Sequence, residues 1–306
     1  MASEAAKLTV VVPAYNEEER ITECVRALKA KASDLQDGGI VLSVFVVDDG
    51  SSDRTRSLAE NAGADRIVRH KVNQGLGAAI RSGLRAAESA GADIVVKFDA
   101  DLQHDPEDIP ALIAPLLDDE ADVVYGNRFD RIEYRMPLVR RTGNRVFTAI
   151  MRRLTGWPLR DSQPGIFAVN RDYLRRFHLP GDYNYTQQIL LDAYHKGMRF
   201  AHVPVRFRER TTGRSFVSLK YPFRVSYQIL LVLAGTHPMR VFGSVGLFFL
   251  TIAFGVSVVE IVLFFAGRMP EPIVHANAVL GSLTLGLQTF FFGLLGELIV
   301  KGRHTR

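Results

Sequence analysis

The chain has 306 residues, of which 47% are hydrophobic, so it is long enough for one large domain with an appendage or for two small domains. Its single cysteine excludes a disulfide-stapled secreted fold and fits a reducing compartment. The net charge is +5, and two basic blocks stand out at residues 128–160 and 199–224. Neither block carries an aromatic-rich or helix-turn-helix signature, so the composition does not favour nucleic-acid binding.

The first 125 residues alternate short apolar runs with helical patterns. The apolar runs have the composition of buried strands and lie at residues 8–13, 41–47, 65–69, 93–98 and 122–125. Helical patterns with start signals lie between them, ending near residue 31, following Ser52-Asp53, and covering 75–89 and 105–117. This alternation predicts an α/β fold with a mainly parallel sheet and right-handed crossovers. Cys24 lies among apolar residues at helical spacing, which predicts a buried core thiol.

Polar segments follow three of these strands, at residues 14–17 (AYNE), 48–51 (DDGS) and 99–101 (DAD). Ligands of such sheets sit outside the carboxyl ends of the strands, so we expect the three segments to form one site. Asp99 and Asp101 are two residues apart in an extended segment, which points both side chains to the same side. With Gln103 beyond them, they make an oxygen-rich site for Mg²⁺ or Mn²⁺.

The later part of the chain ends in two long apolar runs. Residues 241–266 and 277–300 carry one acid each, Glu260 and Glu297, and both exceed the ~20 residues that cross a bilayer as a helix. We predict two membrane spans joined by a tight hairpin at 267–276; the alternative is a pair of buried helices in a soluble domain. The positive-inside rule places both termini in the cytoplasm, and the N-terminus lacks a secretory signal.

Four motifs, VVVPAYNEEERI, VFVVDDGSSDRT, NQGLGAAIRSGLRAA and KFDADLQHDPEDIP, carry a resemblance across the soluble half. In this order and at these intervals they resemble the inverting, nucleotide-sugar-dependent glycosyltransferases of family 2, which have the GT-A fold. DADLQH, a later GNR and two C-terminal spans are similar to polyprenyl- or dolichyl-phosphate hexose synthases of the dolichol-phosphate mannose synthase type. The Gln-x-x-Arg-Trp motif of processive polysaccharide synthases is missing from the sequence, which argues against a polymerase.

The resemblance implies a domain organisation and an activity. Residues 1–215 form a cytoplasmic GT-A domain, 216–239 an interfacial amphipathic segment, and 240–306 a two-span hairpin with a basic tail. The implied reaction is the metal-dependent, inverting transfer of a hexose from a nucleotide-diphosphate sugar to polyprenyl or dolichyl phosphate on the cytoplasmic leaflet. Glu260, deep in the first span, predicts a helix–helix or oligomer contact, and so a possible homo-oligomer.

The resemblance also implies roles for residues of the donor site. In the family, the residue at the position of Asp99 faces the nucleotide, and those at the positions of Asp101 and Gln103 ligate the metal. The spacing of the two carboxylates in this sequence predicts that Asp99 is a metal ligand as well. The expected nucleotide-binding residues are Pro13, Tyr15, Asn16, Glu17, Asp48, Asp49, Gly75 and Asp99. Asp53 fits a helix cap better than a ligand-binding role.

On the acceptor side, a lipid phosphate is already ionised, so it needs positioning and charge compensation rather than a strong base. Arginines supply both through bidentate contacts. Arg128 and Arg141 are the first candidates, with Arg210 and Arg214 as helpers; the alternative is a membrane-facing patch without catalysis. Lys220 is a substitute for a family lysine, whose position holds Phe216 here.

The remaining alternatives concern the reaction partners. DADLQH favours GDP-mannose as donor, whereas two spans after the catalytic domain are typical of the glucosyl and related bacterial enzymes. UDP-glucose and UDP-N-acetylglucosamine are therefore the alternative donors. Transfer to a hydroxyl acceptor would need a general base, and Asp161, in a segment similar to one in the family, is the candidate. A membrane adaptor with an inert fold would have lost the metal motif, which is intact.

Overall fold

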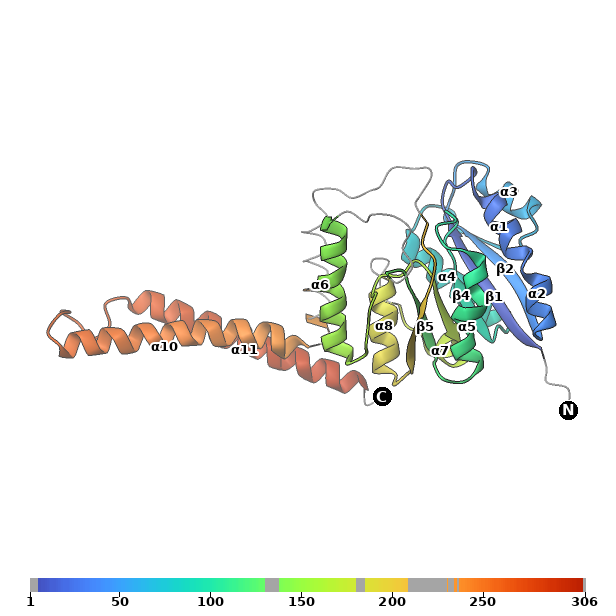
Figure 1. The fold of residues 1–306 in the computed structure, drawn as a ribbon. Helices are drawn as coiled ribbons and strands as arrows, with labels where there is room; N and C mark the ends of the chain where they lie inside the picture. Colours follow the sequence, from blue (N-terminus) through green and yellow to red (C-terminus); the bar gives the residue numbers. More distant parts are fainter. Residues whose placement is uncertain are drawn as a thin grey trace. The chain divides into compact units, whose positions relative to one another are not determined.

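The structure is a computed structural model that describes residues 5–129, 138–179, 185–208, 230, 234–235 and 237–304. The chain divides into two compact units, Met1–Arg214 and Ser215–Arg306. The strands of the first unit are β1 (Ala6–Ala14), β2 (Ile40–Asp48), β3 (Arg66–Arg69), β4 (Ile94–Lys97), β5 (Val123–Asn127), β6 (Phe167–Asn170) and β7 (Phe200–Pro204). Its helices are α1 (Ile21–Lys29), α2 (Ala32–Asp37), α3 (Thr55–Asn61), α4 (Leu76–Ser89), η1 (Pro106–Asp108), α5 (Ile109–Leu117), α6 (Leu138–Thr155), α7 (Arg171–Arg176) and α8 (Tyr185–His195) (Figure 1).

The seven strands form one sheet in the order β3-β2-β1-β4-β6-β5-β7, and the predicted α/β fold is confirmed. All neighbouring strands are parallel except β6, which runs antiparallel to both β4 and β5. The apolar run Ile166 to Val169 predicts this strand but carries no information about its direction, so the sequence left the orientation open. The short helices α2, α7 and α8 and the edge strand β7 were not predicted.

Both faces of β1 are buried, which explains its continuous apolar sequence. Val10 and Val12 point into the core that contains the apolar faces of α1 and α5. Val11 points to the other face, where α4 approaches so closely that a Cβ on Gly83 would lie 2.2 Å from its Cγ1. Cys24 is fully buried in the first of these cores, as predicted, and burial raises the pKa of its thiol.

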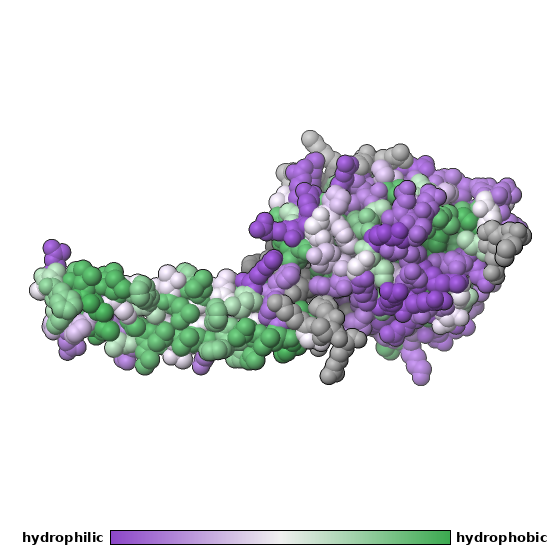
Figure 2. All heavy atoms as spheres, turned by 90° about the horizontal axis from the view of Figure 1, so that it is seen from below, coloured by the Kyte–Doolittle hydropathy of each residue, from purple (hydrophilic) through white to green (hydrophobic). Residues whose placement is uncertain are grey.

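The second unit contains η2 (Met239–Gly243), α10 (Ser244–Phe265) and α11 (Ala276–His304). Two helical stretches, Met239–Phe265 and Ala276–Val300, are long and apolar enough to cross a membrane. Only 11% of the most apolar part of each stretch is buried within the protein. Their surface is largely hydrophobic, in contrast to the hydrophilic surface of the first unit (Figure 2). α10 and α11 pack at backbone distance, because a Cβ on Gly246 would lie 2.8 Å from the carbonyl oxygen of Gly286.

The buried carboxylate of Glu260 in α10 binds His275, which precedes α11, with 2.5 Å between its Oε1 and the histidine Nδ1. This contact lies within the hairpin; the oligomer contact predicted for Glu260 stays a prediction. The interfacial segment predicted at 216–239 falls almost entirely outside the described residues.

Candidate functional site

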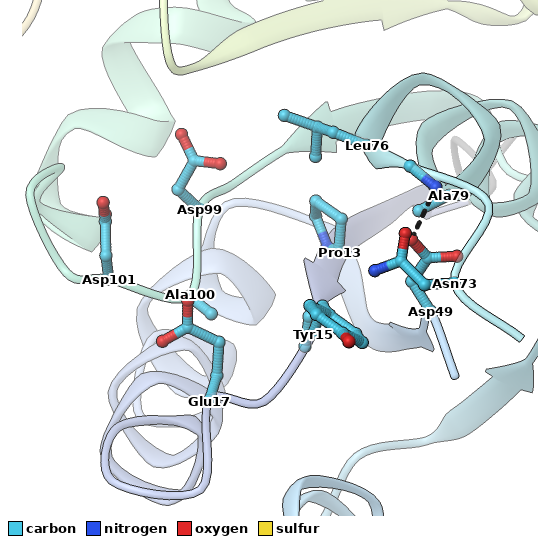
Figure 3. A pocket seen from close by; sticks show the side chains of 12 residues that line it. Pro13, Tyr15, Glu17, Asp49, Asn73, Leu76, Ala79, Asp99, Ala100 and Asp101 are labelled. Carbon is cyan, nitrogen blue, oxygen red and sulfur yellow. Dashed lines mark hydrogen bonds between the residues drawn. The ribbon is translucent and has the colours of Figure 1, made fainter. Parts of the chain in front are cut away.

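A cleft of about 330 Å³ lies at the carboxyl ends of β1, β2 and β4, which are neighbours in the sheet. It is lined by Pro13, Ala14, Tyr15, Glu17, Asp49, Asn73, Gly75, Leu76, Ala79, Asp99, Ala100 and Asp101 (Figure 3). The three polar segments that follow these strands therefore meet, as the sequence predicts. Sequence reasoning missed Asn73 and Leu76, although both lie in or beside the quoted NQGLG motif.

The floor of the cleft is preorganised by Asp49. Its carboxylate accepts hydrogen bonds from the backbone N–H groups of Gln74 and Gly75, each at 2.9 Å, and contacts His70 Nδ1 at 2.6 Å. Gly75 has φ of +92°, a conformation that favours glycine. Asp49 thus holds the loop that carries Asn73 and Gly75 against the cleft, a contribution additional to the nucleotide-binding role predicted for it.

Two other predicted donor residues do not line the cleft but shape the loops around it. Asn16 has φ of +54°, and its Oδ1 accepts a hydrogen bond from the N–H of Ser52 at 2.9 Å. Asp48 is buried and accepts from the N–H of Ser51 at 2.9 Å. Asp53 accepts from the N–H of Thr55, the first residue of α3, at 2.9 Å, but Arg54 rather than Asp53 occupies the N-cap position of that helix.

Asp99 and Asp101 point in the same direction from the segment that follows β4 (Figure 3). The predicted reason is wrong, because β4 ends at Lys97 and residues 100 and 101 form a turn rather than a continued strand. The side chain of Asp99 is 28% exposed, so this carboxylate is accessible from the cleft. Gln103, the third predicted ligand, donates its Nε2 to the carbonyl oxygen of Arg208 at 3.1 Å.

The donor atoms in this turn fit an ion of the Mg²⁺ or Mn²⁺ class. Within the described ranges, no three His, Cys, Asp or Glu side chains converge to form a complete metal site. Mg²⁺ is commonly held by only one or two carboxylates, with water and substrate phosphates as the other ligands. Asp99 and Asp101 match such a partial oxygen shell, and it would need a phosphate-bearing ligand in the cleft to complete it.

Lys97 is a buried cation at this turn that sequence reasoning missed. Its Nζ lies 2.5 Å from Asp99 Oδ1 and 2.6 Å from the carbonyl oxygen of Gly165, and its side chain is completely buried. The available signal was a lysine at the end of the apolar run Ile94-Val95-Val96, two residues before an aspartate. Burial lowers the pKa of Lys97 and the Asp99 carboxylate raises it, with a net upward shift, so the ammonium stays charged.

Gly165 brings the segment before β6 against the turn. A Cβ at this position would lie 2.3 Å from His104 Nε2 and 3.0 Å from Asp99 Oδ2, so only glycine fits without displacement. His104 is buried beside the ring of Phe207, at 5.0 Å between ring centroids. Burial lowers the pKa of His104 to about 3, so the imidazole is neutral at physiological pH.

Arg128 and Asp161, two predicted catalytic residues, form a buried ion pair. Arg128 Nε donates to Asp161 Oδ2 at 2.8 Å and its Nη2 donates to Oδ1 at 3.3 Å. Asn144 Nδ2 and the backbone N–H of Gln163 also donate to Asp161 Oδ1, and Arg128 Nη2 donates to the Gln163 carbonyl oxygen at 2.5 Å. Burial raises the pKa of Asp161, the Arg128 charge lowers it, and the net pKa lies below its usual value.

The arrangement of this pair bears on both predicted roles. The side chain of Asp161 is 0% exposed and that of Arg128 is 6% exposed. A carboxylate with four donors and a depressed pKa is poorly suited to accept a proton from a substrate hydroxyl. Arg141, in contrast, lies exposed in the first turns of α6. Arg210, Arg214 and Lys220 fall outside the described residues.

Comparisons with known proteins agree with this picture of the first unit. Residues 9–177 match the model of glycosyl transferase family 2. The chain is 30% identical over 309 residues to the undecaprenyl-phosphate 4-deoxy-4-formamido-L-arabinose transferase of Salmonella paratyphi A, covering 97% of this chain and 89% of that protein. It is 29% identical to the UDP-N-acetylglucosamine–dolichyl-phosphate N-acetylglucosaminyltransferase of Methanococcus voltae, covering 74% of this chain and 96% of that protein.

A solved structure is similar over most of the chain. Glucosyl-3-phosphoglycerate synthase from Mycobacterium tuberculosis, in complex with Mn²⁺, uridine diphosphate and glucosyl-3-phosphoglycerate, superposes with a TM-score of 0.58 and 26% identity. The match covers 75% of this chain and 79% of that one. The same enzyme has also been solved with Mg²⁺ and uridine diphosphate. The GT-A fold expected from the motifs is therefore confirmed.

Proposed function

The chain belongs to glycosyl transferase family 2, and from that premise we propose that it transfers a sugar from a nucleotide-diphosphate donor to a polyprenyl or dolichyl phosphate. The Salmonella and Methanococcus relatives, whose names give such acceptors, support this choice. The match to the Salmonella enzyme spans 97% of this chain, so it includes the two apolar helices. Those helices anchor the enzyme in the membrane from which the acceptor is drawn.

The observation that carries the proposal is the pair of carboxylates, Asp99 and Asp101, that face one way in a cleft at the carboxyl edge of the sheet. With Gln103 they would hold Mg²⁺ or Mn²⁺ against the donor diphosphate. Such an ion, when bound, neutralises the charge that develops on the departing nucleoside diphosphate. Pro13, Tyr15 and Glu17 frame the nucleoside from the segment after β1.

We propose a uridine-diphosphate donor ahead of the GDP-mannose predicted from DADLQH. The Methanococcus relative is named for UDP-N-acetylglucosamine, and the similar solved structure holds uridine diphosphate. We propose transfer of a sugar rather than specifically of a hexose, because the Salmonella relative is named for a formamido-arabinose. GDP-mannose and UDP-glucose remain the donors to compare.

The burial of Asp161, the one predicted general base, favours a phosphate acceptor over a hydroxyl acceptor. The reaction is a single displacement, in which the ionised phosphate oxygen attacks the anomeric carbon and the nucleoside diphosphate leaves. This nucleophile needs no proton removed, and the one predicted base, Asp161, is buried against Arg128. We assign Arg128 and Asp161 to holding the 161–165 segment in place, and the exposed Arg141 to the acceptor phosphate together with Arg210, Arg214 and Lys220. A cytoplasmic orientation stays a prediction from the basic residues that flank the spans.

The test is label transfer by the full-length protein in detergent with Mn²⁺. UDP-N-acetylglucosamine, UDP-glucose and GDP-mannose, each labelled in the sugar, are incubated separately with polyprenyl phosphate, with the matching polyprenol, or with 3-phosphoglycerate. We expect label in the organic phase from one donor with the lipid phosphate only, and none in an Asp101→Asn variant. Equal transfer to the polyprenol would contradict the phosphate acceptor, and transfer to 3-phosphoglycerate alone would make the enzyme a soluble-acceptor glycosyltransferase.

A further inference from the structure

Lys97 sits where a lysine is energetically demanding. It is the last residue of β4, between Val11 of β1 and Phe167 of β6 in the sheet, and its side chain is 0% exposed. Burial of an ammonium group is costly unless charge and hydrogen bonds compensate it. Here Asp99 Oδ1 lies at 2.5 Å, the Gly165 carbonyl oxygen at 2.6 Å, and the ring of Tyr185 lies 5.6 Å from Nζ. These contacts and its complete burial therefore hold the Lys97 ammonium in a single position.

The position of Lys97 changes the charge of the cleft. Glu17, Asp49, Asp99 and Asp101 line it, so the acids alone would present four negative charges. The ammonium of Lys97 compensates the charge of Asp99 from behind, on the side away from solvent. Two other cationic side chains lie near this cluster: Arg128 is paired with Asp161, and Arg20 Nη1 donates to the backbone carbonyl oxygen of Asp101 at 3.0 Å. His104 is neutral. Lys97 is therefore the cation that lies directly against the carboxylate of Asp99.

We propose that Lys97 is a fixed internal cation that holds the Asp99 carboxylate in one orientation in the absence of a divalent ion, and that it weakens binding of that ion to the turn. The inference rests on the proposed metal role of Asp99 and Asp101. A fixed ammonium beside one carboxylate repels Mn²⁺ or Mg²⁺, and its repulsion is little screened because the group is buried. A weakly held ion would leave the protein together with the nucleoside diphosphate instead of staying bound to the turn.

The first experiment measures Mn²⁺ binding directly, from the electron paramagnetic resonance signal of free Mn²⁺, without any turnover. The full-length protein is compared with Lys97→Met and Lys97→Gln. Glutamine removes the charge but retains an N–H donor, whereas methionine removes both, so the pair of variants separates electrostatic repulsion from hydrogen bonding. We expect both variants to bind Mn²⁺ about tenfold more tightly than the parent protein.

Arg171→Gln is the matched control. Arg171 pairs with Asp93 at 2.7 Å, just before β4 begins, so the variant loses the same charge at the opposite end of the same strand. Its affinity for Mn²⁺ should equal that of the parent protein, since exposed charges beyond ~10 Å are largely screened in 0.1 M salt.

If Lys97→Met fails to fold, a second comparison keeps the test decisive. Asp99→Asn leaves the ammonium uncompensated, whereas Asp99→Asn with Lys97→Met removes both charges of the pair. We expect the double variant to bind Mn²⁺ about tenfold more tightly than Asp99→Asn alone. Equal affinities in this pair, or parental or weaker affinity in Lys97→Gln, would overturn the role of Lys97 and leave the proposed function intact. A parent protein that transfers sugar yet binds no Mn²⁺ would instead overturn the metal role and this inference with it.

Discussion

The cleft at the carboxyl edge of the sheet and the buried 161–165 segment use the same residue types in opposite ways. In the cleft, the side chain of Asp99 is 28% exposed and shares its direction with Asp101. In the buried segment, Asp161 is 0% exposed and all its partners belong to the protein. A carboxylate that faces open space can exchange partners, whereas one sealed with an arginine fixes the backbone around it. Motif resemblance suggested a catalytic aspartate in both regions, and burial separates them.

The largest effect that we expect is from Asp101→Asn, which tests the cleft side of this comparison. Loss of one carboxylate should lower turnover by about 10³-fold, equivalent to ~4 kcal/mol of transition-state stabilisation, because the diphosphate-bound ion loses a ligand. Folding should change little, since the site is open. Initial rates of label transfer and a thermal melt measure both quantities. Asp118→Asn, an exposed carboxylate after α5, is the control, and equal losses in the two variants would remove Asp101 from the site.

Arg128→Met tests the buried side and should act on folding first. Removing one partner of a buried ion pair leaves an uncompensated charge and typically costs about 3–5 kcal/mol of stability. The double variant Arg128→Met with Asp161→Leu should lose less than the single variant, because no charge is left unpaired. Denaturant unfolding of the detergent-solubilised protein measures the cycle. A variant that unfolds like the parent protein but has lost its activity would return Arg128 to the catalytic role that the motifs imply.

The sequence was sufficient to predict where the cleft lies, because its acidic residues directly follow strands. In an α/β fold the residues that follow parallel strands lie at the same edge of the sheet. Asp49, Asp99 and Asp101 could be placed together in this way. Arg128 and Asp161 are 33 positions apart, and only the antiparallel entry of β6 determines that they meet. In the sequence, Lys97 only interrupts an apolar run. Its contact with Gly165 could not be predicted, because the two residues are 68 positions apart. Contacts made across the sheet carry no local signature.

Arg141→Gln contrasts an exposed arginine with the buried Arg128. Arg141 is in α6 and exposed, and a charge-assisted hydrogen bond to a phosphate is worth roughly 1.5–3 kcal/mol before solvent screening. We expect the KM for polyprenyl phosphate to rise about tenfold and kcat to stay within about twofold. Arg153→Gln, also exposed but in the last turns of the same helix, should leave both constants unchanged. Equal changes in the two variants would mean a diffuse basic surface rather than a phosphate site.

The smallest expected effect is a pH dependence of stability that distinguishes a structural from a catalytic Asp161. Its folded-state pKa lies below the value of about 3.9 in the unfolded chain, so its ionic contribution is fully present above that pH and is lost as the pH falls through the folded pKa. The stability difference between the parent protein and Asp161→Asn should therefore be constant from pH 5 to pH 8. Below about pH 4 it should shrink, by at most ~1.4 kcal/mol per pH unit. A general base needs a pKa raised towards neutrality, which would move this change into the range between pH 5 and pH 8. Unfolding curves collected across both ranges decide between the two roles, since only one of them leaves the neutral range flat.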